Sequence, residues 1–164
     1  MKQLWSPWRS QYIESLHHPD NECEFCLIMK ANNDGQTYVL LRKEYNYIVM
    51  NLYPYNSGHL LVVPYQHIDD TTLLPEAALT EAIVLIQYCL KALRTVFNAD
   101  GFNIGVNIGA AAGAGIADHV HFHIVPRWLG DTNFLPIFSE TKVISQDLRE
   151  MYNTLKTELL KIVP

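Results

Sequence analysis

Three histidines at alternate positions form the most chemically distinctive stretch of this 164-residue chain. His119, His121 and His123 are separated by Val120 and Phe122. Alternation of polar with β-branched or aromatic residues is typical of a half-buried strand, whose alternate side chains share a face. The sequence therefore predicts three imidazoles in a row on one face of a strand. Such a row suits either a metal site of neutral imidazoles or a nucleophile flanked by helper groups.

A loop of small residues directly precedes the predicted histidine strand. It ends in Gly113, Ala114 and Gly115, and three residues then lead to His119. Backbone N–H groups in such a loop approach a ligand closely and can bind an anion, so we expect a phosphate beside the imidazoles. The chain lacks the glycine-rich patterns of P-loop and dinucleotide-binding folds. The residues alone thus indicate phosphoryl or nucleotidyl chemistry, with the central His121 as the natural nucleophile.

Two of the three cysteines form a second candidate site. Cys23 and Cys26 are spaced as C-E-F-C, a pattern used for zinc binding or redox chemistry. Two histidines from later in the chain would complete the four nitrogen and sulfur ligands that structural zinc requires. The third cysteine, Cys89, lies in an apolar helical pattern and is expected in the core.

Composition narrows the class of protein. Hydrophobic residues make up 49% and charged residues 18% of the chain, which predicts one globular domain spanning residues 1–164. The net charge of −5 argues against nucleic acid and anionic membranes as partners, although a local site can still bind a small phosphorylated ligand. No apolar run approaches the roughly 18 residues of a membrane span, and no signal peptide is evident. We expect a cytoplasmic protein.

The elements that would position these residues follow from hydrophobic periodicity. An N-terminal arm is expected over residues 1–22 and a C-terminal helical extension over 141–164, with its helix after Ser145. One long helix is predicted over 75–97, and its apolar surface is wide enough to suggest that a second subunit covers part of it. Strands are predicted over 37–41, 45–50, 59–64 and 102–108, followed by the histidine strand.

Taken together, these stretches resemble the histidine triad (HIT) superfamily. Its signature H-φ-H-φ-H-φ-φ is matched at every position by residues 119–125. The similarity extends to C-E-F-C, N-L-Y-P-Y-N-S-G-H-L-L-V-V-P and G-F-N-I-G-V-N-I-G, and the continuation R-W-L-G-D-T-N-F resembles the bacterial diadenosine tetraphosphate phosphorylase-like branch. The resemblance implies an α+β fold with a five-stranded antiparallel sheet, one long helix, a C-terminal helix and a homodimeric assembly.

The resemblance also implies nucleotidyl transfer from a nucleoside phosphate or dinucleoside polyphosphate. His121 would attack the α-phosphorus and form a nucleotidyl-histidine, which water or inorganic phosphate then releases without any cofactor. His123 would hold the phosphate and complete the catalytic row. Asn51 matches a ribose-binding position, and Asn107 and the loop 113–115 match positions near the phosphates.

A structural zinc site is a further implication of the resemblance. Its ligands would be Cys23, Cys26, His67 and His119, so the first histidine of the triad would serve the metal. Such a closed four-ligand site stabilises a fold and does not activate water.

One departure and two alternatives accompany this interpretation. Gly115 stands where many members carry Gln, which favours a polyphosphate leaving group over an amine. His59 is expected either behind the catalytic row or in a purely structural role. The alternatives are a metal-dependent hydrolase, in which all three triad histidines bind one ion, and a non-catalytic nucleotide-binding module.

Overall fold

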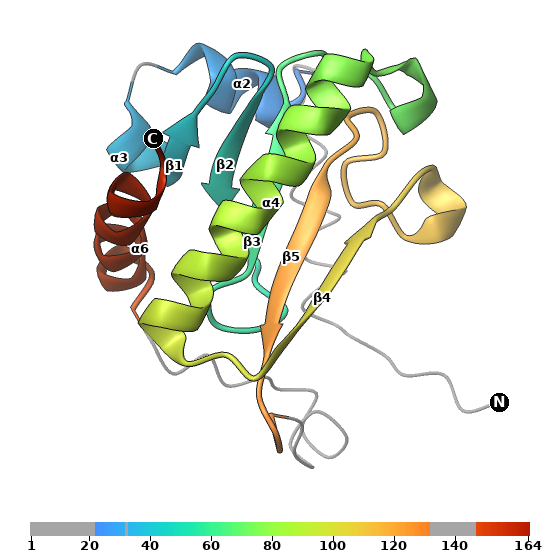
Figure 1. Ribbon diagram of the computed structural model, residues 1–164. Helices are drawn as coiled ribbons and strands as arrows, with labels where there is room; N and C mark the ends of the chain where they lie inside the picture. The colour runs from blue at the N-terminus through green and yellow to red at the C-terminus, as the bar shows by residue number, and fades with distance from the viewer. Residues whose placement is uncertain (1–21, 32, 132–146) are drawn as a thin grey trace, which may run out of the picture.

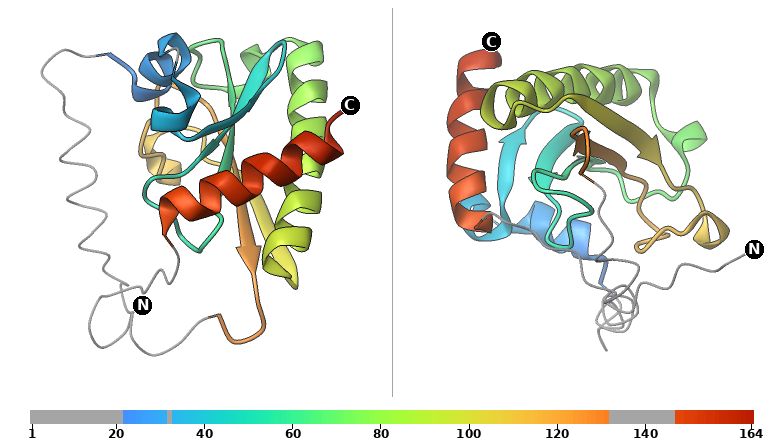
Figure 2. Two further views of the ribbon diagram at one scale, coloured as in Figure 1. Left: turned by 90° about the vertical axis from the view of Figure 1, so that its left-hand side faces the viewer. Right: turned by 90° about the horizontal axis from the view of Figure 1, so that it is seen from below.

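A single antiparallel sheet with helices on both faces organises the chain. The computed structural model describes residues 22–31, 33–131 and 147–164. Two helices, α4 and α6, cover one face of the sheet, and the short helix α2 lies on the other face (Figures 1 and 2). The predicted arm 1–22 lies outside the described residues except for Glu22, as does the start of the predicted extension, 141–146.

The sheet has five strands in the order β1-β2-β3-β5-β4, and every neighbouring pair is antiparallel. The predicted α+β fold with a five-stranded antiparallel sheet is therefore confirmed. Its strands are β1 (Val39–Arg42), β2 (Asn46–Met50), β3 (Leu60–Pro64), β4 (Gly101–Val106) and β5 (Phe122–Arg127).

The histidine strand is shorter than predicted. β5 begins at Phe122, which pairs with Val62 of β3 and Val106 of β4, so His119 and His121 precede the ladder. The alternation of faces nevertheless holds across this stretch. Phe122 and Ile124 pack towards α4, whereas His121 and His123 line a pocket on the other face.

The long helix α4 (Glu76–Phe97) closely matches the predicted span 75–97. Pro75 occupies its N-cap, and Asn98 ends it in the left-handed conformation with an N–H bond to the carbonyl of Arg94. Its buried residues recur at spacings of three and four, as an amphipathic helix requires. They are Ala78, Ala82, Leu85, Ile86, Cys89, Ala92 and Leu93. The spacing of the larger apolar residues in the sequence predicts that Ile83 shares a buried face with Ile86 and Leu93, but Ile83 is 54% exposed.

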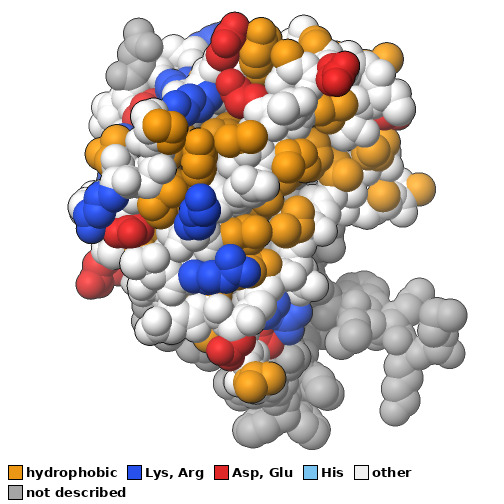
Figure 3. Space-filling view, in the orientation of Figure 1, with side chains coloured by type: hydrophobic (Ala, Val, Ile, Leu, Met, Phe, Trp, Pro, Cys, Tyr) orange, Lys and Arg blue, Asp and Glu red, His pale blue; other side chains and the backbone are white. Residues whose placement is uncertain are grey.

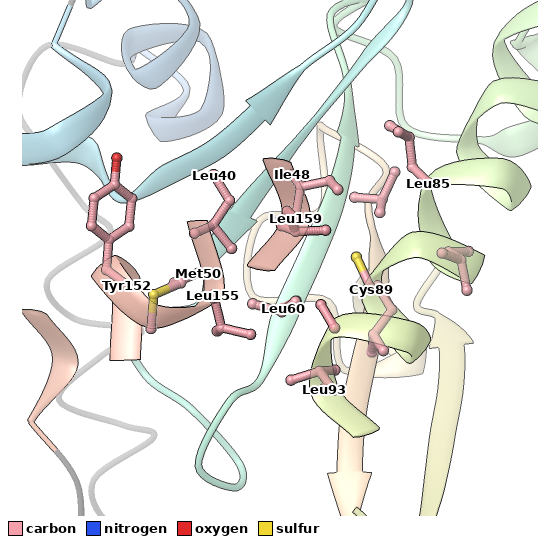
Figure 4. Packing of buried hydrophobic residues seen from close by; sticks show 14 of the residues in the cluster. Leu40, Ile48, Met50, Leu60, Leu85, Cys89, Leu93, Tyr152, Leu155 and Leu159 are labelled. Carbon is pink, nitrogen blue, oxygen red and sulfur yellow. The ribbon is translucent and has the colours of Figure 1, made fainter. Parts of the chain in front are cut away.

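The C-terminal helix α6 (Leu148–Ile162) packs against α4 and β1. Asp147 caps it by accepting hydrogen bonds from the N–H groups of Arg149 and Glu150. The helix thus begins three residues after Ser145, which lies outside the described residues. Figure 4 shows the core between these helices and the sheet, where Leu155 of α6 lies near Leu60 and Leu159 lies near Ile48.

Helix α2 (Glu24–Lys30) covers the opposite face and was not predicted from the sequence. Its Phe25 packs with five buried strand residues, Val39, Tyr47, Val49, Leu61 and Val63. Arg42 of β1 donates hydrogen bonds to the carbonyls of Ile28, Met29 and Ala31 at the C-terminal end of the helix. A side chain remote in sequence therefore satisfies backbone groups that the short helix leaves without partners.

Three short helical segments complete the described fold. Helix α3 (Asp34–Thr37) is capped by Asn33 and shortens β1, which begins at Val39 and not at the predicted residue 37. The 3-10 turns η1 (Thr71–Leu73) and η2 (Ala110–Ala112) lead into α4 and the histidine stretch. Within the described residues, no helix has both the length and the apolar character needed to cross a membrane.

Candidate active site and metal cluster

A pocket opens on the sheet face that α2 partly covers. Two histidines of the predicted row, His121 and His123, form part of its lining. Phe25 and Ile28 of α2 contribute a second wall. The row of paired residues from β5 through β3 to β2 runs His123, Leu61, Val49, so the pocket passes from imidazoles to apolar strand residues. One end is thus polar and the other apolar, as a nucleotide site requires.

The geometry of His121 fixes the position of its proton. Its Nδ1 lies 2.8 Å from the carbonyl oxygen of His119, and a carbonyl can only accept, so Nδ1 carries the hydrogen. The neutral ring then keeps a lone pair on Nε2. The side chain is only 5% exposed, and burial lowers its pKa, while the bond to the carbonyl opposes this shift. The ring is therefore held neutral, in the form that a nucleophilic imidazole needs.

Two successive hydrogen bonds determine which ring nitrogen of His123 carries the proton. The N–H of Tyr55 donates to Nδ1 of His59 at 3.1 Å, so the proton of a neutral His59 is on Nε2. That Nε2 lies 3.0 Å from Nδ1 of His123 and donates to it. The proton of a neutral His123 consequently lies on Nε2. The rings of His121 and His123 are 4.7 Å apart, so a lone pair and an N–H donor stand side by side.

The first histidine of the row faces a different cluster. Nε2 of His119 donates to the carbonyl of Pro64 at 2.8 Å, which leaves a lone pair on Nδ1. This Nδ1 lies 3.4 Å from Sγ of Cys23 and 3.7 Å from Sγ of Cys26. Nδ1 of His67 is 3.4 Å from Sγ of Cys26. The four predicted metal ligands are thus brought together, with their ligand atoms within 4.8 Å of one another.

The donor set and its spacing fit a tetrahedral metal ion. Bonds of about 2.3 Å to sulfur and 2.0–2.1 Å to nitrogen at a tetrahedral angle place S and N about 3.6 Å apart. The three sulfur–nitrogen distances, 3.4, 3.4 and 3.7 Å, lie close to that value. Burial raises the pKa of the Cys23 thiol to about 11, so a metal must displace its proton on binding. These residues could hold a metal ion.

Of the other predicted nucleotide-binding residues, some line the pocket and others do not. Asn51, Asn107 and Gly115 line it. Gly113 and Ala114 are not among its lining residues, because the loop turns at η2 and Gly113 ends that turn in the left-handed conformation.

The amide of Asn51 is already engaged within the protein. Its Oδ1 accepts from the N–H of Tyr53 at 2.9 Å, and its Nδ2 lies 3.2 Å from Nδ1 of His59. A ribose hydroxyl would therefore use the second lone pair of the oxygen or the second hydrogen of the NH₂ group.

Sequence reasoning missed the contribution of α2 and of Tyr55. Phe25 contacts His121, with ring centroids 4.8 Å apart, and Tyr55 stacks on His123 at 5.8 Å. The only local signal was the apolar spacing of Phe25 and Ile28 around the cysteine pair, which is too short to reveal a helix.

Comparison with known proteins agrees with this fold. The HIT domain family model matches residues 32–128. The AP-4-A phosphorylase of Mycobacterium tuberculosis is 36% identical over 165 residues, covering 96% of this chain and 84% of that protein. An adenosine 5'-monophosphoramidase of Saccharomyces cerevisiae is 31% identical over 108 residues, covering 66% of this chain and 64% of that protein.

A solved structure of a histidine triad protein is also similar to this chain. The zinc-bound histidine triad family protein of Mycobacterium smegmatis superposes with a TM-score of 0.69 at 27% identity, covering 86% of this chain and 95% of that one. The family match spans the triad, all five strands and the pocket-lining residues outside α2. By sequence, fold and the arrangement of its histidines, the chain belongs to the HIT family.

Proposed function

We propose that the protein is a nucleotidyl hydrolase or phosphorylase that cleaves dinucleoside polyphosphates, such as diadenosine tetraphosphate, through a covalent nucleotidyl-histidine on His121. The observation that carries the proposal is the tautomer of this ring: Nδ1 is bound to the His119 carbonyl, so Nε2 keeps its lone pair in a pocket-lining side chain. The similarity to a phosphorylase of AP-4-A over almost the whole chain supports the substrate class.

The first chemical step forms a P–N bond and breaks a P–O bond. Nε2 of His121 attacks the α-phosphorus, and the electron pair of the broken bond leaves with the polyphosphate nucleotide. In the second step, an oxygen of water or inorganic phosphate attacks the same phosphorus. The P–N bond breaks and its electron pair returns to Nε2, which restores the neutral ring, and a proton of attacking water is released to solvent. Diadenosine tetraphosphate thus yields ATP first, followed by AMP with water or ADP with phosphate.

His123 and the loop before β5 stabilise the charge that develops on phosphorus. The Nε2–H of His123 donates to a phosphoryl oxygen, since His59 holds its Nδ1 as an acceptor. Gly115 offers a backbone group in place of the side chain that other members carry at this position. A polyphosphate leaves as a stable anion and needs less protonation than an amine, so it suits this pocket better.

The metal cluster would hold zinc in a structural role. Two sulfur and two nitrogen donors close a four-coordinate site and leave no open position for water, so no step of the reaction passes through the metal. The similarity to a zinc-bound HIT protein supports this identity. Reduced thiols are needed for such a site, and the described cysteines are free, which favours the reducing cytoplasm.

The protein forms a homodimer across β4 in this proposal. β4 lies at the edge of the sheet, where its outer backbone groups can pair with another strand. Ile104 on β4 is 49% exposed, and Ile83 and Val84 of α4 are also exposed. Figure 3 shows hydrophobic side chains gathered on the face that carries both elements. The net charge of −5 makes nucleic acid and anionic membranes poor partners in comparison.

The two alternatives have less support. A hydrolase that binds one ion with all three triad histidines requires their lone pairs to converge, but His119 points towards the cysteines and His121 bonds the His119 carbonyl through Nδ1. Within the described residues, His119 is the only triad histidine that belongs to the metal cluster. A binding module without turnover would not need the paired tautomers of His121 and His123.

A product assay tests the proposed function. The full-length protein is incubated with diadenosine tetraphosphate, with and without inorganic phosphate, and nucleotides are separated by chromatography. ADP and ATP appearing only with phosphate identify a phosphorylase, whereas AMP and ATP identify a hydrolase. Adenosine 5'-phosphoramidate serves as the comparison substrate and should react more slowly. Absence of turnover with all of these substrates would refute the proposal.

A further inference from the structure

Helix α2 lies between the metal cluster and the nucleotide pocket and takes part in both. Cys23 and Cys26 point to the cluster, while Phe25 and Ile28 line the pocket. The helix has only seven residues, and its N-cap, Cys23, makes no side-chain capping bond. A helix this short is not stable by itself, so its position depends on anchors to the rest of the fold.

The anchors at the two ends of α2 differ in kind. Arg42 holds the C-terminal end through three backbone carbonyls. Near the N-terminal end, the Tyr47 hydroxyl donates to the carbonyl of Phe25 at 3.0 Å. Phe25 also packs against the sheet there, and the two cysteines face His119 and His67. A metal ion would bind this turn firmly to the stretch that leads into β5.

Phe25 touches both sites. Its side chain is 5% exposed, and its ring lies 5.4 Å from that of His119, edge-on at 73°, and 4.8 Å from that of His121. One aromatic ring thus contacts a metal ligand and the nucleophile and also forms pocket wall. Any shift of the first turn of α2 moves this ring relative to His121.

We propose that Phe25 is a positioning residue through which the metal cluster and the nucleotide pocket are thermodynamically coupled. Zinc fixes the first turn of α2, which holds Phe25 against His121 and completes the wall of the pocket. Nucleotide binding in turn favours the metal-bound arrangement. Because coupling between two binding sites is reciprocal, zinc must raise the affinity for nucleotide by the same factor by which nucleotide raises the affinity for zinc. The inference rests on the proposed function and the proposed zinc site.

A second route between the sites passes through the main chain, because the carbonyl of His119 accepts from His121. Substitution of Phe25 separates the two routes, since it leaves this bond and all four metal ligands in place. Ile28→Ala is the matched control, because Ile28 lines the same wall one turn further along α2.

The test measures both affinities in the full-length protein. The zinc dissociation constant is obtained by competition with a chelator of known affinity, with and without saturating AMP, and the AMP dissociation constant is obtained with and without zinc. We expect each ligand to tighten the other by at least about fivefold, with the two factors equal. Phe25→Ala should bind zinc but lose most of this factor, and Phe25→Leu should restore part of it. Ile28→Ala should weaken AMP binding equally in both metal states.

Four results would overturn the inference. Unchanged zinc affinity with bound AMP in an active enzyme removes the coupling and leaves the proposed function intact. Full coupling in Phe25→Ala assigns it to the main-chain route. An active protein that binds no zinc refutes the metal site and the coupling together, and a protein that binds zinc but no AMP refutes the nucleotide site and the proposed function.

Discussion

Main-chain groups set the proton positions of the histidines in this site. The carbonyl of Pro64 turns the lone pair of His119 towards the cysteines, and the carbonyl of His119 turns that of His121 away from the backbone. His59 then passes the effect of the Tyr55 N–H on to His123. These proton positions support the proposal that neighbouring histidines of one motif serve as a metal ligand, a nucleophile and a donor.

The most informative substitution at this scale is His59→Ala. It removes the donor to Nδ1 of His123, so the proton of that ring can move to the wrong nitrogen. We expect kcat to fall by about 100-fold with a small change in KM, because the loss acts on charge that develops in the transition state. Steady-state kinetics measure the changes in kcat and KM separately, and a melting curve checks that the variant is folded. A rise in KM alone would show that His59 serves binding and not the tautomer.

At the scale of elements, the tight turn before β3 limits which residues can replace Gly58. Gly58 has a φ of +76°, and a Cβ there would lie 3.0 Å from side-chain atoms of Leu93 and Phe97 on α4. Gly58→Ala should lower the free energy of unfolding by about 2 kcal/mol or more through strain and overpacking. Gly101→Ala is the control, since a Cβ there meets nothing within 4 Å, and should change stability by less than about 0.5 kcal/mol. Chemical denaturation compares them, and equal effects would contradict the argument.

The end of β5 is tied to the loop after β2 by one carboxylate. Asp131 accepts from the Arg127 guanidinium, from the N–H of Trp128 and from the side chain of Asn56. The Arg127 guanidinium, aided by the other two donors, holds the pKa of this carboxyl well below its usual range. The ionised form therefore stabilises the fold above the unfolded-state pKa of about 3.9, and this stabilisation is lost as pH falls towards the folded-state pKa.

Asp131→Asn tests this dependence on pH. The stability difference between wild type and variant should be largest at neutral pH and should shrink steadily below pH of about 4. Denaturant unfolding of both proteins at a series of pH values measures it. A difference that stays constant down to the acid transition would mean that the ion pair adds nothing beyond its neutral hydrogen bonds.

At the scale of the whole molecule, the exposed edge of β4 predicts the assembly. Ile104→Lys should convert the proposed dimer into a monomer, because it would place a charge in the apolar surface of the edge strand in both subunits. Light scattering on eluted protein measures the mass. Leu129→Lys changes a side chain that is 94% exposed and serves as the control. A wild-type monomer, or an Ile104→Lys dimer, would contradict the proposed interface.

Periodicity along the chain predicted most of the fold. The pattern of α4 and the alternation around the histidines gave the sheet face and the long helix, because burial on one face leaves a repeat in the sequence. Helix α2 left no such trace, because seven residues are too few to show a repeat, and its last carbonyls are satisfied by Arg42 from the distant strand β1. β5 begins at Phe122 opposite Val106, the last residue of β4, although β3 continues to Pro64, and the histidine stretch itself does not record where β4 ends.

The candidate site, like the fold, could be predicted only in part from the sequence. Residue type and spacing were enough to single out the triad and the cysteine pair, because few other arrangements use such residues. The wall formed by Phe25, the link from His59 to His123 and the position of Gly113 away from the pocket arise from contacts between distant segments. Those contacts exist only once the sheet has formed.

The central claim is that Nε2 of His121 becomes covalently bonded to the α-phosphorus of the substrate. The direct measurement is mass spectrometry of peptides from enzyme mixed with diadenosine tetraphosphate and quenched rapidly at alkaline pH, where a P–N bond survives. We expect an adenylyl group on His121 in the wild type, and none in His121→Ala, whose turnover should fall by at least about a thousandfold. An adenylyl group on another residue, or undiminished turnover in His121→Ala, would contradict the account.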